Sequence, residues 1–276
     1  MGTLSKMTTL VAALATTTAM GFSASTASAA DLLIDPPVIE APVVVQKGGW
    51  YLRGDVTYDF QEIRGAYAYG GSGTFEGKDF EVDDAFDIGF GVGYDTGTGL
   101  RVDATLDYVF EADLKGSFAC FDRPATATLI GTTGCGADNM TAEKATFTTF
   151  KAMANAYYDL GRFGNLTPYV GAGLGGAYVK YDGYMQDAVN TFVDGTTTSQ
   201  MHKDLDGSWR FAWALHAGAS YDISERLKFD VGYSYNRIEE GPIAGFDLTN
   251  SSDRAQIYDE GFNTHVIKAG LRYHLW

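Results

Sequence analysis

The amino-acid sequence predicts an all-β fold: an up-and-down, eight-stranded antiparallel barrel that crosses a membrane and carries four long extracellular loops. Three observations support this prediction. The chain opens with a segment typical of exported proteins, apolar and polar residues then alternate along eight runs, and short and long connections alternate between those runs. After residue 30 no apolar run approaches the roughly 18 residues of a membrane helix, so a closed barrel is the remaining way across.

Residues 1–29 predict a cleaved signal peptide. Lys6 supplies a weakly positive start, residues 7–22 are apolar, and residues 27–29 read Ala-Ser-Ala, which fits an A-x-A cleavage site. Residues 30–48 contain three prolines and predict an extended periplasmic lead-in. The barrel is therefore expected over residues 49–276.

The charge balance excludes one class of partner. The chain has 20 Lys and Arg against 35 Asp and Glu, a net charge of −15, and no basic patch that could neutralise phosphates, so no nucleic acid is expected. Carboxylates in the loops could bind divalent cations, but no EF-hand spacing is present. A solvated acidic loop surface is the favoured interpretation, and no metal or cofactor is expected.

The chain has two cysteines, Cys120 and Cys135, in a segment rich in Gly and Thr. In an exported protein two cysteines this close predict one disulfide that closes a loop. A metal site would require further Cys or His nearby, and the segment has none.

Eight runs follow a period of two, which is typical of a strand with two different faces. In the third run Val102, Ala104 and Leu106 share one face, and Arg101 and Asp103 share the other. The runs are residues 50–60, 84–94, 100–110, 147–160, 167–181, 208–222, 227–237 and 263–275.

The ends of the apolar faces distinguish a membrane barrel from a soluble sandwich. Aromatic residues gather near both ends of the strands, with Leu, Val, Ile and Ala between them; examples are Trp50, Tyr94 and Tyr158 at one end and Phe60, Tyr108 and Trp213 at the other. Aromatic rings suit the headgroup regions of a bilayer. The apolar faces are therefore expected to meet lipid.

Connection lengths predict the orientation. Residues 95–99, 161–166 and 223–226 form short turns, whereas residues 61–83, 111–146, 182–207 and 238–262 form long segments. Outer-membrane barrels place short turns in the periplasm and long loops outside. The protein is therefore expected in an outer membrane, with both ends of the barrel chain in the periplasm.

Four segments resemble the small OmpA-like or opacity-type outer-membrane proteins, often called porin family proteins. They are GWYLRGDVTYDF, TPYVGAGLGGAYV, LKFDVGYSYNRI and the terminal VIKAGLRYHLW, and the resemblance covers residues 49–276. It implies an outer-membrane barrel that the barrel assembly machinery inserts. One feature departs from the pattern: Trp276, the terminal aromatic residue, lies one position out of step with the outward series.

The inward faces carry charges of both signs, and two interpretations apply. The charges could line an ion-selective pore, or they could pair and fill the interior. The near-equal counts and the narrowness of eight strands favour pairing. The predicted network comprises Arg53, Asp55, Asp87, Arg101, Asp103, Asp107, Lys151, Asp159, Lys228, Asp230, Lys268 and Arg272.

No catalytic constellation is expected. The four histidines are His202, His216, His265 and His274; none has a serine motif beside it, and no GxSxG sequence occurs.

Three functions remain open. The favoured one is a structural barrel that contributes to envelope integrity, displays its loops and allows at most passive passage of small solutes. The alternatives are a loop-mediated adhesin or ligand receptor and a narrow ion-selective porin. The expected partners are outer-membrane lipid and lipopolysaccharide, together with a host or surface ligand for the loops.

Overall fold

The computed structural model describes residues 48–70, 73–119, 140–190, 196–201, 207–247 and 254–275. The expected signal peptide, residues 30–47 of the lead-in, Cys120, Cys135, His202 and Trp276 lie outside these residues. Within the described part of the chain, no helix is long and apolar enough to cross a membrane.

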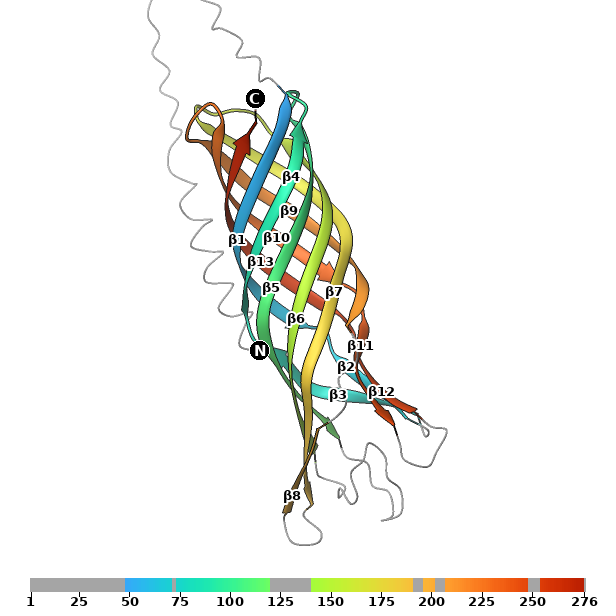
Figure 1. Cartoon of the computed structure of the whole chain (residues 1–276). Helices are drawn as coiled ribbons and strands as arrows, with labels where there is room; N and C mark the ends of the chain where they lie inside the picture. The colour runs from blue at the N-terminus through green and yellow to red at the C-terminus, as the bar shows by residue number, and fades with distance from the viewer. Residues whose placement is uncertain are drawn as a thin grey trace, which may run out of the picture. The chain divides into compact units, whose positions relative to one another are not determined.

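Eight antiparallel strands close into a barrel, which confirms the predicted fold (Figure 1). Each strand pairs with the next, and the first pairs with the last: Tyr51 of β1 lies opposite His274 of β13. The strands are β1 (Gly49–Ile63), β4 (Ala85–Asp95), β5 (Leu100–Ala119), β6 (Met140–Asp159), β7 (Leu166–Asn190), β9 (Ser208–Asp222), β10 (Leu227–Ile238) and β13 (Phe262–His274).

The strand faces differ as the alternation predicted. On β4, Phe86 and Phe90 are 59% and 66% exposed, whereas Asp87 between them is buried. Large apolar side chains thus point out of the barrel and charged ones point in, the reverse of a soluble protein and the arrangement that lipid requires. Gly93 leaves room for the Tyr51 ring inside the barrel, because a Cβ atom at position 93 would collide with that ring.

Short turns join β4 to β5, β6 to β7 and β9 to β10 at the end of the barrel where β13 finishes (Figure 1). We call this the turn end and the opposite end the loop end. The first turn is closed by the Thr96 amide, which donates to the Leu100 carbonyl over 3.0 Å. Gly97 and Gly99 adopt φ angles of 76° and 91°, a conformation that glycine tolerates best.

At the loop end each of the four predicted long segments contains strands. Residues 111–119 and 140–146 continue β5 and β6 as a paired ladder up to Ala119 and Met140. Continued pairing satisfies backbone groups that a loop would leave to water. The additional strands are β2 (Ala66–Gly70), β3 (Gly73–Val82), β8 (Thr196–Met201), β11 (Gly241–Asp247) and β12 (Arg254–Asp259).

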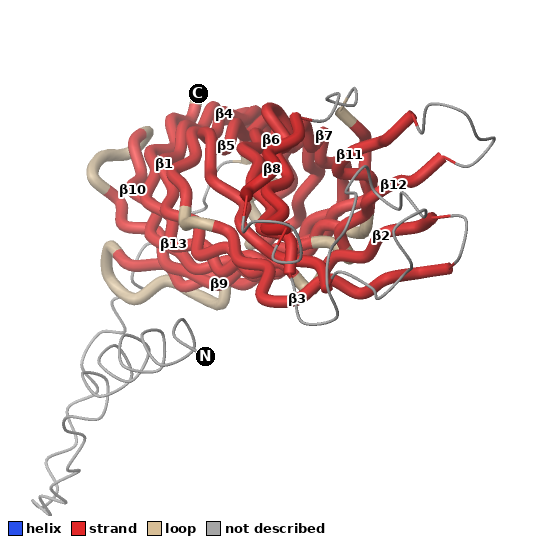
Figure 2. The backbone as a smooth tube through the Cα atoms, turned by 90° about the horizontal axis from the view of Figure 1, so that it is seen from below, coloured by secondary structure: helices blue, strands red, loops and turns tan. Residues whose placement is uncertain are grey.

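These strands form one continuous structure, which we call the outer sheet. It runs in the order β11, β12, β2, β3, β5, then continues through the extensions of β6 and β7 to β8. Its far edge, β11, lies against β7 and β9. Figure 2 views the loop end and shows β11, β12, β2 and β3 projecting to one side.

Candidate functional site: the barrel interior

The turn end of the interior is filled by a network around Arg53. Its guanidinium pairs with Asp55 over 2.8 Å and Asp103 over 2.7 Å, and donates to the Tyr157 hydroxyl over 3.1 Å. The Tyr51 hydroxyl donates to Asp103 over 3.0 Å. All five side chains are buried. Because β1 and β6 are not neighbours in the barrel, the contact from Arg53 to Tyr157 spans the interior.

A second guanidinium, that of Arg101, lies between two tyrosine rings. It is 5.1 Å from the ring centres of both Tyr157 and Tyr169 and pairs with Asp159 over 2.8 Å. Arginine stacks on aromatic faces while it binds carboxylate, so these rings compensate for the water that Arg101 loses.

Two further buried cations at the turn end, Arg272 and Lys228, are also paired. Arg272 contacts Asp230 over 3.1 Å and donates to the Ser220 hydroxyl over 2.7 Å. Lys228 lies 3.2 Å from Asp222. Burying a charge is tolerated only with such partners, and the turn end meets that condition.

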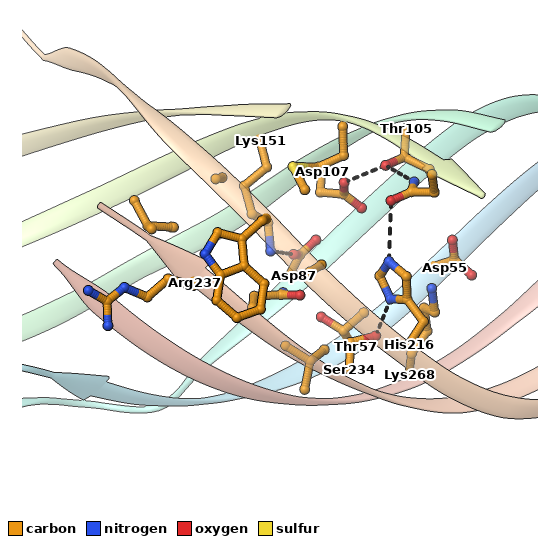
Figure 3. Close-up of a pocket in the computed structure, with 18 of the residues that line it drawn as sticks. Asp55, Thr57, Asp87, Thr105, Asp107, Lys151, His216, Ser234, Arg237 and Lys268 are labelled. Atoms are coloured by element: carbon orange, nitrogen blue, oxygen red, sulfur yellow. Dashed lines mark hydrogen bonds and ion pairs between the residues drawn. The ribbon is translucent and has the colours of Figure 1, made fainter. Parts of the chain in front are cut away.

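In the middle of the barrel, Lys151 pairs with Asp87 over 2.6 Å and with Asp59 over 3.5 Å. Beside this group lies a cavity of about 50 Å³ (Figure 3). Lys268 and Asp107 line the cavity, yet no ion pair joins either of them to another described residue. Asp107 accepts a hydrogen bond from the Thr105 hydroxyl over 3.0 Å. The structure thus leaves two members of the predicted network outside the direct pairs.

His216 lies on the cavity wall between Ser234 and Asn155. Its Nδ1 is 2.7 Å from the Ser234 hydroxyl, and its Nε2 is 3.2 Å from the Asn155 amide oxygen (Figure 3). The cavity has room for about one or two water molecules, too little for a substrate. The arrangement can hold water and orient a histidine.

The other histidines of the described chain lie apart from this cluster. His274 is near the turn end, 5.6 Å from the Tyr51 ring, and His265 is on the outward face beside Tyr233. Among the described residues, no group of three or more His, Cys, Asp or Glu side chains is placed to hold a metal ion.

Toward the loop end the interior becomes apolar, a feature that the sequence analysis missed. Phe147 of β6 and Phe262 of β13 stack with ring centres 5.4 Å apart and planes 16° apart. In the circular strand order these two strands lie opposite each other, so the rings meet across the barrel. Buried apolar side chains surround them, including Val109, Val179, Ala212 and Ile238. They occupy inward positions of the alternation, and that placement was a readable signal.

Asp259 connects the outer sheet to the barrel wall. Its carboxylate is fully buried. The Nη1 atom of Arg210 donates to its Oδ1 over 2.8 Å and to its Oδ2 over 2.7 Å. The Tyr181 hydroxyl and the Gly261 amide also donate to it, over 2.9 and 2.8 Å. We call this group the Asp259 latch. It links β12 with β9 and β7, within a long segment that the sequence analysis interpreted as part of a solvated acidic loop surface.

A second buried contact stiffens the outer sheet. The Tyr184 hydroxyl donates to the Glu143 carboxylate over 2.6 Å, between the extensions of β7 and β6. Burial raises the pKa of the Tyr184 hydroxyl well above its usual value, and the Glu143 charge raises it further. The hydroxyl therefore stays protonated and remains a donor.

The family model for the outer membrane protein β-barrel domain matches residues 14–274. The chain belongs to this outer-membrane β-barrel family. The predicted resemblance and the outer-membrane location are therefore confirmed. A Brucella abortus protein without an assigned function is 40% identical over 272 residues, which cover 91% of this chain and 93% of the relative. A Rickettsia conorii protein named "Putative adhesin RC1281" is 23% identical, covering 82% of each chain.

Solved structures of barrel proteins are similar at low sequence identity. OprG of Pseudomonas aeruginosa is 16% identical with a TM-score of 0.48, covering 83% of this chain and 99% of OprG. Neisserial surface protein A is 17% identical with a TM-score of 0.41, covering 82% of this chain and 97% of that protein.

Proposed function

We propose that this outer-membrane barrel is a non-conducting structural protein of the envelope that holds its outer sheet at the cell surface. The observation that carries this proposal is the double closure of the barrel interior. Paired charges cross the turn end, and the stacked Phe147 and Phe262 rings cross the loop end. The proposed partners are the surrounding outer-membrane lipid and lipopolysaccharide, with the barrel assembly machinery for insertion.

The two closures differ chemically, so one condition does not remove both. A fall in pH that protonates carboxylates weakens ion pairs but leaves stacked rings in place. The 50 Å³ cavity lies between them and accommodates about one or two water molecules. Eight strands enclose an interior that side chains can fill, which agrees with passive permeability at most.

Conductance of refolded protein in planar bilayers tests the proposal. The unaltered chain is expected to give no discrete channel steps. A variant that truncates both closures, Arg53→Ala and Tyr157→Ala with Phe147→Ala and Phe262→Ala, is expected to conduct if heat-modifiable mobility shows that it folds. Each pair of substitutions alone serves as a control and should stay closed. Discrete steps from the unaltered chain would favour the narrow porin instead.

A second candidate function is adhesion through the outer sheet. Tyr67 of β2 and Tyr258 of β12 stack at 5.5 Å with planes 13° apart, and the Asp259 latch supports the sheet beneath them. Relatives from Rickettsia bear the name "Putative adhesin". A preformed surface loses little conformational entropy on binding, which favours contact with a partner.

Whole-cell attachment to a panel of surfaces tests adhesion. Replacing residues 66–82 by a Gly/Ser linker should reduce attachment, whereas changing residues 96–98 of the turn end should not. Attachment that is unchanged on every surface would remove the adhesin candidate and leave the structural role.

A further inference from the structure

One sector of the outward barrel surface carries polar donors at the level where the strands approach the loop end. Arg237 of β10 lies directly opposite Asn263 of β13 in the strand register. Both neighbours in sequence, Ile238 and Phe262, are buried inside, so Arg237 and Asn263 point outward. Arg237 is among the residues that line the central cavity, and Figure 3 shows its guanidinium directed away from the cavity.

The acceptors in this sector are already used. The Asn263 Oδ1 atom accepts hydrogen bonds from Nη1 of Arg237 over 2.9 Å and from the Tyr235 hydroxyl over 3.0 Å. The amide nitrogen of the same side chain has no hydrogen-bond acceptor among the described residues. A guanidinium has five N–H donors, and Asn263 satisfies one of them.

The nearest carboxylate leaves Arg237 weakly paired. Glu239 Oε2 is 3.6 Å from Nη2, and the Glu239 side chain is 45% exposed, against 15% for Arg237. The Arg237 Nε is enclosed and has no partner among the described residues. A cation this enclosed gains more from a fixed acceptor than from a solvated carboxylate.

His265 adds a third polar group. Its Nδ1 is 2.6 Å from the Tyr233 hydroxyl, while its Nε2 makes no hydrogen bond to the described chain. The ring centres of His265 and Tyr235 are 5.3 Å apart, and Tyr235 also packs 5.6 Å from Trp213. Aromatic rings therefore frame the donors, as is usual at a membrane interface.

An apolar strip begins directly below these donors, toward the turn end. Leu215, Tyr233 and Ile267 are exposed on the outward faces of β9, β10 and β13. An acyl chain can lie on this strip while its headgroup reaches the donors. On the adjacent strand β1, Tyr58 lies opposite Ile267 in the strand register, and its hydroxyl donates to Asp84 over 3.2 Å, so the apolar strip is bordered on this side by a carboxylate.

We propose that Arg237, Asn263 and His265 bind the phosphate of an outer-leaflet lipid headgroup, with an acyl chain along Leu215 and Ile267. Phosphate oxygens are acceptors only, and arginine binds them with a planar pair of donors. A phosphorylated headgroup supplies this group at the depth of the aromatic girdle. The proposal does not depend on whether the barrel conducts or adheres, so the conductance and attachment tests leave it unaffected.

Native mass spectrometry of the refolded chain tests this site. The probes are diphosphorylated lipid A and the same glycolipid with its phosphates removed. The unaltered chain is expected to retain the phosphorylated lipid, and Arg237→Gln to retain it about tenfold less, because a hydrogen bond to a charged group is lost. Lys180→Gln, an exposed lysine on β7, is the matched control and should change nothing.

Three results would overturn the proposal. They are equal retention of the two lipids by the unaltered chain, unchanged retention by Arg237→Gln, and full displacement of lipid by millimolar inorganic phosphate, which would indicate a site for free anions. If Arg237→Gln loses heat-modifiable mobility, the pair Asn263→Leu and His265→Phe replaces it, with the same expected loss. A normal affinity in that pair would also count against the site.

Discussion

Asp103 is the acceptor on which the network at the turn end converges. Its carboxylate pairs with Arg53 and accepts hydrogen bonds from the Tyr51 hydroxyl and from the Asn155 amide, the last over 2.9 Å. Asp103→Asn keeps the shape of the side chain and removes its charge, which leaves Arg53 with Asp55 as its one remaining carboxylate partner among the described residues. Breaking a buried pair in this way should lower the free energy of unfolding by about 3–5 kcal/mol in urea titrations of micelle-refolded protein.

Asp83→Asn is the matched control for this change. Asp83 pairs with Lys115 over 3.3 Å, and both side chains are more than half exposed, at 60% and 57%. Water screens such a pair, so the expected loss is below about 1 kcal/mol. Equal losses in the two variants would show that the interior network contributes no more than surface pairs do.

On the outward face, the same residue type should have different effects at different depths. Leu106→Arg places a charge midway along the lipid-facing part of β5 and should destabilise the barrel by about 2–4 kcal/mol. Asp113→Arg lies farther along β5, in its loop-end extension, and should be nearly neutral. Urea midpoints and heat-modifiable mobility measure both, and a neutral Leu106→Arg would contradict the assignment of this face to lipid.

Residues placed by alternation could be predicted, whereas their partners could not. Period two assigns Arg53 and Asp103 to the interior. Their contact joins β1 to β5, which are not adjacent strands, and so depends on the stagger of the closed barrel. The same stagger leaves Lys268 and Asp107 beside the cavity with no ion pair to any residue that the structure describes. Similar counts of each sign therefore did not guarantee that every charge is paired.

Among the elements, the Asp259 latch is expected to hold the outer sheet in place. Asp259→Asn removes the charge that Arg210 needs, and amide exchange in β11 and β12 should accelerate at least about tenfold. Exchange in β1 and β4 should not change. Glu240→Gln, an exposed neighbour, is the control. Unchanged exchange in β11 and β12 after Asp259→Asn would show that the outer sheet is held by its apolar contacts alone.

The outer sheet also shows where reading the sequence element by element reached its limit. Leu114 and Phe118 continue the alternation of β5 beyond the membrane, with buried side chains, but length alone had assigned residues 111–146 to a loop. Strand pairing between β12 and β2 joins segments far apart in sequence, and local patterns carry no signal for it. Alternation of apolar and polar residues predicted the barrel strands because lipid imposes that pattern, and no such constraint acts on the outer sheet.

At the scale of the whole molecule, the pairing of β1 with β13 affects how fast the barrel folds. The Leu275 amide donates to the Trp50 carbonyl over 2.9 Å, so the last strand meets the first and the ring closes only when both are present. Contacts this distant in sequence fold slowly. Closure of the ring is therefore expected to be the slow, late step of folding, because it requires residues from the two ends of the barrel segment to meet.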